Sequence, residues 1–176
     1  MLSSRTMNRP LLLATAIALL TSGCDLSSKH WAILTTARGP RSVIPGALDL
    51  VHWENPGMAF SLMRNWPPGI RMWLLSVAAL VAIGIGLVAV ARRPMGLVAT
   101  VGVGLIVGGA LGNFIDRAHN GTVTDFLHVH RGSFDWPAFN VADMAVTCGA
   151  LLMLIGMSRV RNAAEPAAWP GRDDGS

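Results

Sequence analysis

Charged residues are scarce in this chain of 176 residues. Only 14% of the residues are Asp, Glu, Lys or Arg, whereas a soluble domain usually has about 25%. Hydrophobic residues account for 52% of the chain. This composition argues against an ordinary soluble domain and indicates a protein that lies in a membrane.

Cysteines and clustered basic residues are also lacking. The two cysteines, Cys24 and Cys148, lie far apart in apolar segments, so the sequence indicates neither a disulfide framework nor a metal cluster. We interpret both as small packing residues. The net charge of +4 comes from scattered residues, with no basic patch for a phosphate backbone, so we expect no nucleic-acid partner.

The N-terminal part of the chain is similar to the start of a bacterial lipoprotein precursor. A basic start is followed by an apolar run and then by Cys24 within LTSGCDLSSK. However, Thr21 occupies a position where such precursors prefer a branched aliphatic residue, and the chain has three further apolar segments. We therefore treat this similarity as a chance match of a short motif.

Four segments are apolar enough to predict transmembrane helices, each of which needs about 20 residues to cross the hydrocarbon. They cover approximately residues 10–34, 70–91, 95–117 and 139–160. The first is long enough only if its helix continues through Asp25 and Lys29. The predicted fold class is therefore an all-α membrane protein with four transmembrane helices in one domain, residues 10–161.

Two longer regions, 35–69 and 118–138, connect these helices on one side of the membrane. The first alternates apolar and polar residues between turn residues, which predicts short strands on the membrane surface. The third helix contains Gly104, Gly108 and Gly112 at a spacing of four, which predicts a smooth strip for close helix packing.

Short basic flanks place the termini in the cytoplasm by the positive-inside rule. Arg5 and Arg9 precede the first helix, Arg92 and Arg93 lie in the tight second turn, and Arg159 and Arg161 follow the fourth helix. The longer opposite regions also contain basic residues, so a simple count does not decide the orientation. We expect residues 1–9 to be cytoplasmic, Met7 to be an alternative start, and residues 162–176 to be a disordered tail.

Several polar residues lie inside these segments, and most of them are ionisable; an ionisable group there costs at least a few kcal/mol and usually marks a functional site. All of them fall at the helix ends that meet at the outer leaflet. Asp25 and Lys29 end the first helix; Asn113, Asp116 and Arg117 end the third; and Asn140 and Asp143 open the fourth. Their spacings of three and four give each helix one polar face, so we expect these faces to meet.

Asp125 and Asp143 have no evident cation nearby in sequence. Two carboxylates brought together cannot both ionise easily, so one holds a proton while the other acts as a base. Asp25 and Lys29 could form a self-neutralising pair, and Asp116 could hold Arg117 or a helix end. For these residues, structural and functional roles are both open.

Five motifs in this order resemble those of the lipoprotein signal peptidases, also called signal peptidase II. They are DLSSK at 25–29, NPGMAF at 55–60, GGALGNFIDR at 108–117, VTDF at 123–126 and FNVAD at 139–143. The chain departs from the family at Met58, where alanine is more usual, and in the HVH that follows VTDF. Each motif is weak alone, but five in order are specific.

The resemblance implies an aspartyl endopeptidase in the bacterial inner membrane that cuts prolipoproteins just before a diacylglyceryl-modified cysteine. It also implies four transmembrane helices with a small β-cradle on the extracytoplasmic face. It assigns Asp125 and Asp143 as the catalytic pair; Asn55, Asn113, Arg117 and Asn140 as substrate-binding residues; and Asp25, Lys29, Asp116 and Gly57 as supporting residues. We expect no cofactor or metal, lipid and prolipoprotein as partners, and a monomer.

Two alternatives compete with this hypothesis. A metalloprotease is suggested by His119, His128 and His130 near Asp125, but HWEN at His52 is not HExxH, and the other ligands of an HxH are not visible. We therefore predict ordinary surface histidines. A non-catalytic four-helix protein or small transporter is disfavoured because the inner halves of the helices are almost wholly apolar.

Overall fold

The computed structural model describes residues 9–57, 66–92 and 95–164, and the side chains of 68 and 157–164 are outside the description. The predictions for Met58, for the start at Met7 and for most of the C-terminal tail fall outside the described residues. The last helix ends at Ala164, so the first residues of the predicted disordered tail are helical.

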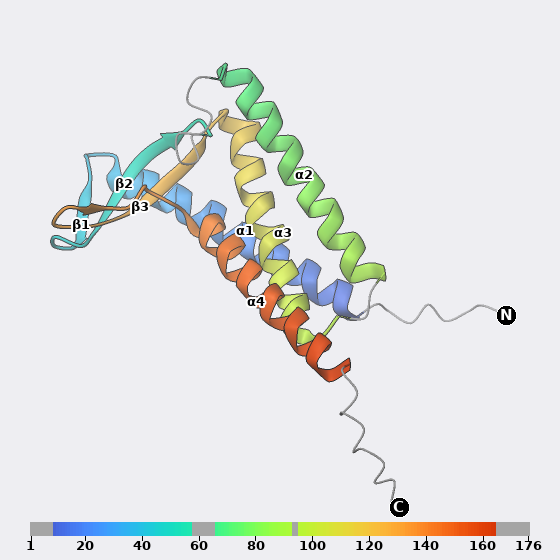
Figure 1. Cartoon of the computed structure of the whole chain (residues 1–176). Helices are drawn as coiled ribbons and strands as arrows, with labels where there is room; N and C mark the ends of the chain where they lie inside the picture. The colour runs from blue at the N-terminus through green and yellow to red at the C-terminus, as the bar shows by residue number, and fades with distance from the viewer. Residues whose placement is uncertain (1–8, 58–65, 93–94, 165–176) are drawn as a thin grey trace, which may run out of the picture.

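Four helices form a bundle, and a small sheet lies at one end of it (Figure 1). The helices are α1 (Arg9–Thr36), α2 (Pro68–Arg92), α3 (Leu97–Asn120) and α4 (Val141–Ala164). Three of them, α1, α2 from Gly69 and α3, are long and apolar enough to cross a membrane. The described apolar part of α4, Val141–Gly156, is shorter. The predicted, mostly helical membrane fold is therefore confirmed in its coarse form.

Helix α1 continues without interruption through Asp25 and Lys29, as a span of this length requires. Its 28 residues correspond to about 42 Å at 1.5 Å per residue. Asp25 and Lys29 are both buried within the bundle, so the polar part of α1 faces protein instead of lipid.

Helix α3 packs against each of the other three helices and forms the centre of the bundle. Its glycines allow this, because a Cβ on Gly108 would lie 2.7 Å from the carbonyl oxygen of Ala18 in α1. On another side, a Cβ on Gly109 would lie 2.5 Å from the carbonyl oxygen of Ala142 in α4. The predicted glycine strip is confirmed as a surface of close helix packing.

The sheet has four antiparallel strands in the order β1-β2-β3-β4. They are β1 (Arg41–Ile44), β2 (Leu48–Asn55), β3 (Val123–Arg131) and β4 (Phe134–Asp135). Strands β2 and β3 come from the two separate connecting regions, and their register is irregular between Leu50 and Trp53. This pairing brings Asn55, at the end of β2, next to Asp125, near the start of β3.

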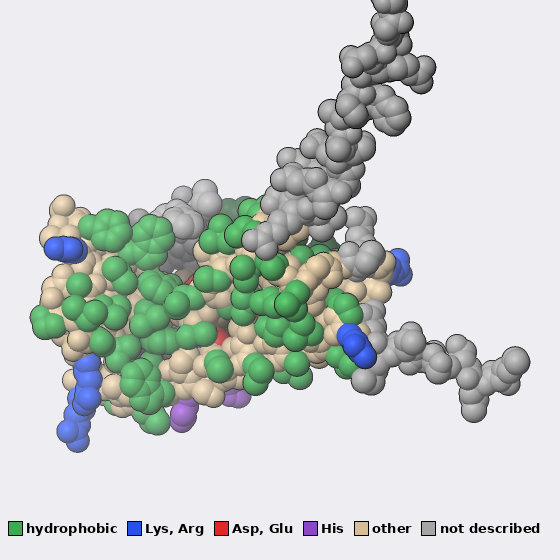
Figure 2. Space-filling view, turned by 90° about the horizontal axis from the view of Figure 1, so that it is seen from below, with side chains coloured by type: hydrophobic (Ala, Val, Ile, Leu, Met, Phe, Trp, Pro, Cys, Tyr) green, Lys and Arg blue, Asp and Glu red, His purple; other side chains and the backbone are tan. Residues whose placement is uncertain are grey.

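Large hydrophobic side chains cover the outside of the bundle. On α2, Trp73 and Ile85 are 68% and 66% exposed, and Figure 2 shows a mostly hydrophobic face with Lys and Arg confined to its two ends. An apolar surface of this extent is not expected on a soluble monomer. The fold therefore defines a protein that crosses a membrane several times.

Candidate active site

The polar residues predicted from α1, α3 and α4 meet residues of β2 and β3 at the sheet end of the bundle. Several of them are almost completely inaccessible to solvent: Asp25, Lys29, Asp116, Asp125 and Asn140 are all 5% exposed or less. Buried polar and charged groups are costly without partners, and each of these side chains has one or more.

Helix α4 begins with a reciprocal cap formed by Asn140 and Asp143. Oδ1 of Asn140 accepts a hydrogen bond from the Asp143 amide at 3.0 Å, and Oδ2 of Asp143 accepts one from the Asn140 amide at 3.3 Å. This arrangement satisfies amides that the first helical turn leaves without partners. It also fixes the Asp143 carboxylate at the positive end of the helix dipole.

Asn140 also contacts the other predicted catalytic residue. Its Nδ2 donates to Oδ1 of Asp125 at 2.7 Å, while its backbone amide donates to Asp143. Asn55 donates from Nδ2 to Oδ2 of Asp125 at 2.8 Å. The two aspartates, from β3 and α4, are thus held on either side of one asparagine, close enough for the charge of Asp143 to act on Asp125.

Lys29 is the cation at the centre of a second group of polar side chains, next to the pair of aspartates. Its Nζ lies 2.8 Å from Oδ2 of Asp25 and 3.2 Å from Oδ2 of Asp116, and it donates to Oδ1 of Asn113 at 2.9 Å. The sequence left open whether Asp116 holds Arg117 or a helix end. Among the described residues its ion pair is with Lys29, and it also accepts hydrogen bonds from Asn120 and from the Thr124 amide.

Asn113 connects Lys29 to Asp143 through hydrogen bonds from both ends of its side-chain amide. A lysine ammonium is only a donor, so the Asn113 oxygen faces Lys29 and its Nδ2 donates to Oδ1 of Asp143 at 2.9 Å. Asp25 joins α1 to the start of α4, because its Oδ1 accepts a hydrogen bond from the Ala142 amide at 2.8 Å. The network therefore links α1, α3 and α4 around the Asp143 carboxylate.

Gly57 supports Asn55 through a turn. Its amide donates to Oδ1 of Asn55 at 2.9 Å, which directs the Asn55 nitrogen toward Asp125. Gly57 has a φ of 91°, and a Cβ there would lie 2.4 Å from a methyl carbon of Leu75. The positive φ favours glycine at this position, because other residues rarely adopt it.

The Asp125 carboxyl group has a pKa raised from its ordinary 3.8 to about 6. Burial is the largest cause, because it disfavours the ionised form, and the nearby charge of Asp143 acts in the same direction. Hydrogen bonds from Asn55 and Asn140 partly offset this effect. Asp125 is therefore a group that can hold or release a proton near neutral pH.

Arg117 is placed beside the site without a direct ion pair to the aspartates among the described residues. Its Nη1 donates to the Asn113 carbonyl oxygen at 3.4 Å, one turn back in α3. It is half-buried and interacts electrostatically with Asp143 and Asp125. Its guanidinium group is therefore available to bind a ligand that enters the site.

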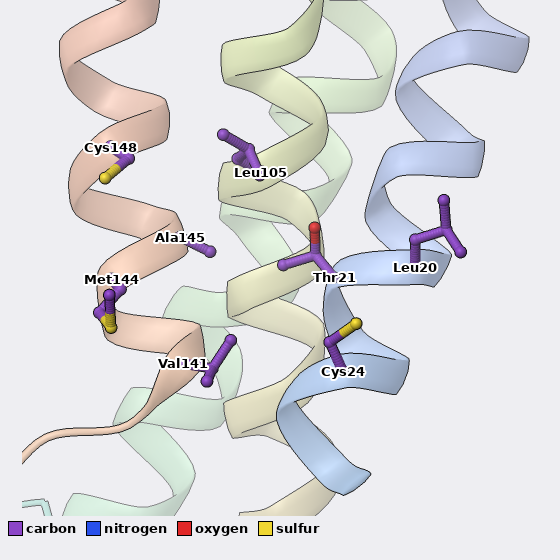
Figure 3. A pocket seen from close by; sticks show the side chains of 8 residues that line it. All are labelled: Leu20, Thr21, Cys24, Leu105, Val141, Met144, Ala145 and Cys148. Carbon is purple, nitrogen blue, oxygen red and sulfur yellow. The ribbon is translucent and has the colours of Figure 1, made fainter. Parts of the chain in front are cut away.

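An apolar pocket of about 380 Å³ lies between α1, α3 and α4, and its lining includes Met144, the residue after Asp143 (Figure 3). It is lined by Leu20, Thr21, Cys24, Leu105, Val141, Met144, Ala145 and Cys148. Both cysteines are free thiols. The sequence treated them as packing residues, whereas they line the wall of this pocket.

Sequence reasoning did not find three partners in the network. The backbone amides of Thr124 and Ala142 donate hydrogen bonds to Asp116 and Asp25. Every residue except proline has a backbone amide, so the residue type does not reveal such a donor. Asn120 donates to Asp116 at 2.7 Å from one helical turn away, so the spacing of four residues could have identified it.

The fold and site define a class: a multi-pass membrane protein with two linked carboxylates in a desolvated polar site beside an apolar pocket. Such a pair can activate water and supply a proton.

Comparison with known proteins agrees with this class. The sequence profile of the family described as Signal peptidase (SPase) II matches residues 17–159. The lipoprotein signal peptidase of Francisella tularensis subsp. novicida is 35% identical over 83% of this chain and 91% of its own length. That of Oleidesulfovibrio alaskensis is 39% identical over 80% of this chain and 91% of its own length.

A solved structure described as a bacterial membrane enzyme superposes with a TM-score of 0.73 at 25% identity, covering 89% of this chain and 93% of that one. A second structure with the same description has a TM-score of 0.69 at 27% identity and covers 82% and 91%. The chain therefore belongs to the signal peptidase II family, a family of membrane peptidases.

Proposed function

We propose that this protein is an aspartyl endopeptidase that removes signal peptides from prolipoproteins, cutting just before a diacylglyceryl-modified cysteine. Family membership supports the peptidase activity and the substrate class. The contact of Asn140 with both Asp125 and Asp143 carries the assignment of the catalytic pair. One asparagine thus contacts a buried acid of β3 and a half-buried acid of α4, which supports the two carboxyl groups acting as a pair.

In the proposed mechanism Asp143 is the general base and Asp125 holds the proton. Hydrogen bonds from the Asn113 side chain and the Asn140 amide hold the Asp143 carboxylate in place, while burial favours the protonated form of Asp125. Asp143 removes a proton from water as the water oxygen bonds to the scissile carbonyl carbon. Asp125 donates its proton to the carbonyl oxygen, so the intermediate is a neutral diol.

Collapse of this diol breaks the carbon–nitrogen bond. Asp143 returns the water proton to the leaving amine, which is the amino group of the lipid-modified cysteine. Asp125 recovers its proton as the carbonyl re-forms, so the pair is restored without a covalent intermediate. Asn55, Asn140 and Arg117 are the groups that position the substrate backbone around these steps.

The apolar pocket beside Asp143 supports the choice of a lipid-bearing substrate. Its lining comes almost entirely from apolar side chains of α1, α3 and α4, so it suits hydrocarbon. When the modified cysteine of a substrate lies at the carboxylates, its acyl chains lie against the lipid-facing surface of the helix bundle. We assign this pocket to one of the acyl chains.

We further propose four membrane spans in a single domain over residues 10–161, with the sheet on the extracytoplasmic side. The start of α1 and the end of α4 lie at the bundle end away from the sheet (Figure 1), which fits two cytoplasmic termini. The membrane is then the bacterial inner membrane, and the monomer is the working unit because the site is built from one chain.

The test is cleavage of a lipid-modified precursor by purified protein in detergent. Wild-type protein is expected to release the signal peptide, whereas Asp125→Asn and Asp143→Asn bind the precursor but lose at least 1,000-fold in kcat, the order expected when the catalytic base is removed. Glu54→Gln serves as the control because this carboxylate is exposed on β2. Near-normal turnover by either Asp variant would overturn the assignment of the pair.

A further inference from the structure

A second group of titratable side chains lies on the outer part of the sheet, away from the catalytic pair. His128 and His130 are two residues apart on β3 and therefore share a face, and their rings stack with centroids 5.2 Å apart. Asp49 of β2 is the register partner of His128. Its Oδ2 lies 2.9 Å from Nε2 of His130.

The three side chains have the spacing of a metal site. One donor atom from each of Asp49, His128 and His130 can be chosen so that all lie within 4.8 Å of one another. Donors around a tetrahedral ion with bonds of about 2.0–2.1 Å are separated by about 3.4 Å. Binding of an ion would therefore draw the three donor atoms together by rotation of their side chains.

The surroundings also suit ion binding. The His128, His130 and Asp49 side chains are only 15%, 28% and 27% exposed, so they are partly desolvated but reachable. Asp135 of β4 lies with Oδ1 2.8 Å from Nε2 of His128, but its side chain is 71% exposed and it is not one of the three residues whose donor atoms lie together.

The donor set indicates the class of metal. Two imidazole nitrogens with carboxylate oxygens suit zinc and neighbouring transition metals, whereas calcium and magnesium prefer an all-oxygen shell. The HVH motif alone predicts ordinary surface histidines, because its further ligands are not visible in the sequence. The register of β2 against β3 supplies Asp49 from a distant part of the chain.

We propose that Asp49, His128 and His130 form a zinc-class metal site that holds β2 against β3. These two strands also carry Asn55 and Asp125, on the other side of the irregular register at Leu50 to Trp53. The metal is structural: it stabilises the sheet that positions Asp125 and takes no part in the hydrolysis. This proposal does not depend on the proposed peptidase function.

Zinc binding to the full chain tests the proposal directly. Protein purified in detergent without a polyhistidine tag is stripped with EDTA, dialysed and titrated with Zn²⁺ by calorimetry. We expect one ion per chain and a melting temperature that rises with zinc, because the ion binds the folded state. The double variant His128→Gln/His130→Gln and the single variant Asp49→Asn are each expected to bind zinc at least tenfold more weakly.

The matched control is His52→Gln. His52 also lies on the sheet and pairs with a carboxylate, Glu54, at 2.8 Å, but it is not part of the three-residue group. It is expected to leave zinc affinity unchanged. Melting curves without metal establish that each variant is folded. If the double variant does not fold, the zinc affinity of Asp49→Asn alone still tests the proposal.

Equal zinc uptake by wild type and Asp49→Asn, or an equal loss in His52→Gln, would overturn the proposal. Precursor cleavage measured with EDTA below the melting temperature of the metal-free protein is expected to persist. Loss of cleavage in a folded, metal-free sample would place the metal in catalysis and contradict the structural role. Failure of zinc binding would leave the peptidase proposal untouched, because the two are measured separately.

Discussion

Nζ of Lys29 lies 2.9 Å from Oδ1 of Asn113, and this contact determines which end of the Asn113 amide faces Asp143. Lysine has only donors, so the amide oxygen turns toward it and the amide nitrogen toward the carboxylate. Lys29 is therefore a positioning residue that acts on the carboxylate pair through a neighbour, in addition to neutralising Asp25 and Asp116.

Replacing this lysine is expected to affect both stability and turnover. Lys29→Met leaves Asp25 and Asp116 buried without their cation, and removal of one member of a buried pair costs about 3–5 kcal/mol. Thermal unfolding in detergent measures this loss. In the fraction that folds, kcat for precursor cleavage is expected to fall at least tenfold because Asn113 is no longer oriented.

His30→Ala is the matched control for Lys29→Met. His30 is the next residue in α1 and is exposed, so neither melting temperature nor kcat is expected to change. Wild-type kcat in folded Lys29→Met protein would show that the lysine is only structural.

The raised pKa of Asp125 predicts the pH dependence of cleavage. With a pKa of about 6, Asp125 carries its proton below this pH and loses it above. If Asp125 is the acid, kcat/KM is expected to decrease as the pH rises through about 6. Asn55→Ala removes a hydrogen bond that favours the ionised form of Asp125. The pKa of Asp125 is therefore expected to rise, and the decrease in kcat/KM is expected to occur at a higher pH.

Asn120→Ala is the control for this pH profile. Asn120 binds Asp116 instead of Asp125, so the midpoint of its alkaline decrease is expected to match the wild type. A midpoint that moves to lower pH in Asn55→Ala would contradict the assignment of Asp125 as the proton donor.

Filling the apolar pocket is expected to weaken binding of lipid-modified substrate. Cys148→Trp adds a large side chain to a recess of about 380 Å³ and should raise KM at least tenfold, because an acyl chain of the substrate loses its place. Cys148→Ala removes only the thiol and should keep the wild-type KM. An unchanged KM in Cys148→Trp would show that the acyl chains lie elsewhere.

The sequence alone determined the helices, the glycine strip of α3 and the set of polar residues at one end of the bundle. These features are local, because hydrophobic length and a spacing of three or four residues fix which face of a helix is apolar or polar. The alternation of helix direction then brought Asp25, Asn113 and Asp143 to the same end.

Only the tertiary structure decided how these residues pair. Asp116 meets Lys29 of another helix instead of its neighbour Arg117, and Asn140 both caps α4 and holds Asp125. The same is true of Asp49 and His130, which are 81 residues apart in sequence. Such contacts depend on helix packing and strand register, and these are fixed by many distant residues together and not by the pattern around any one of them.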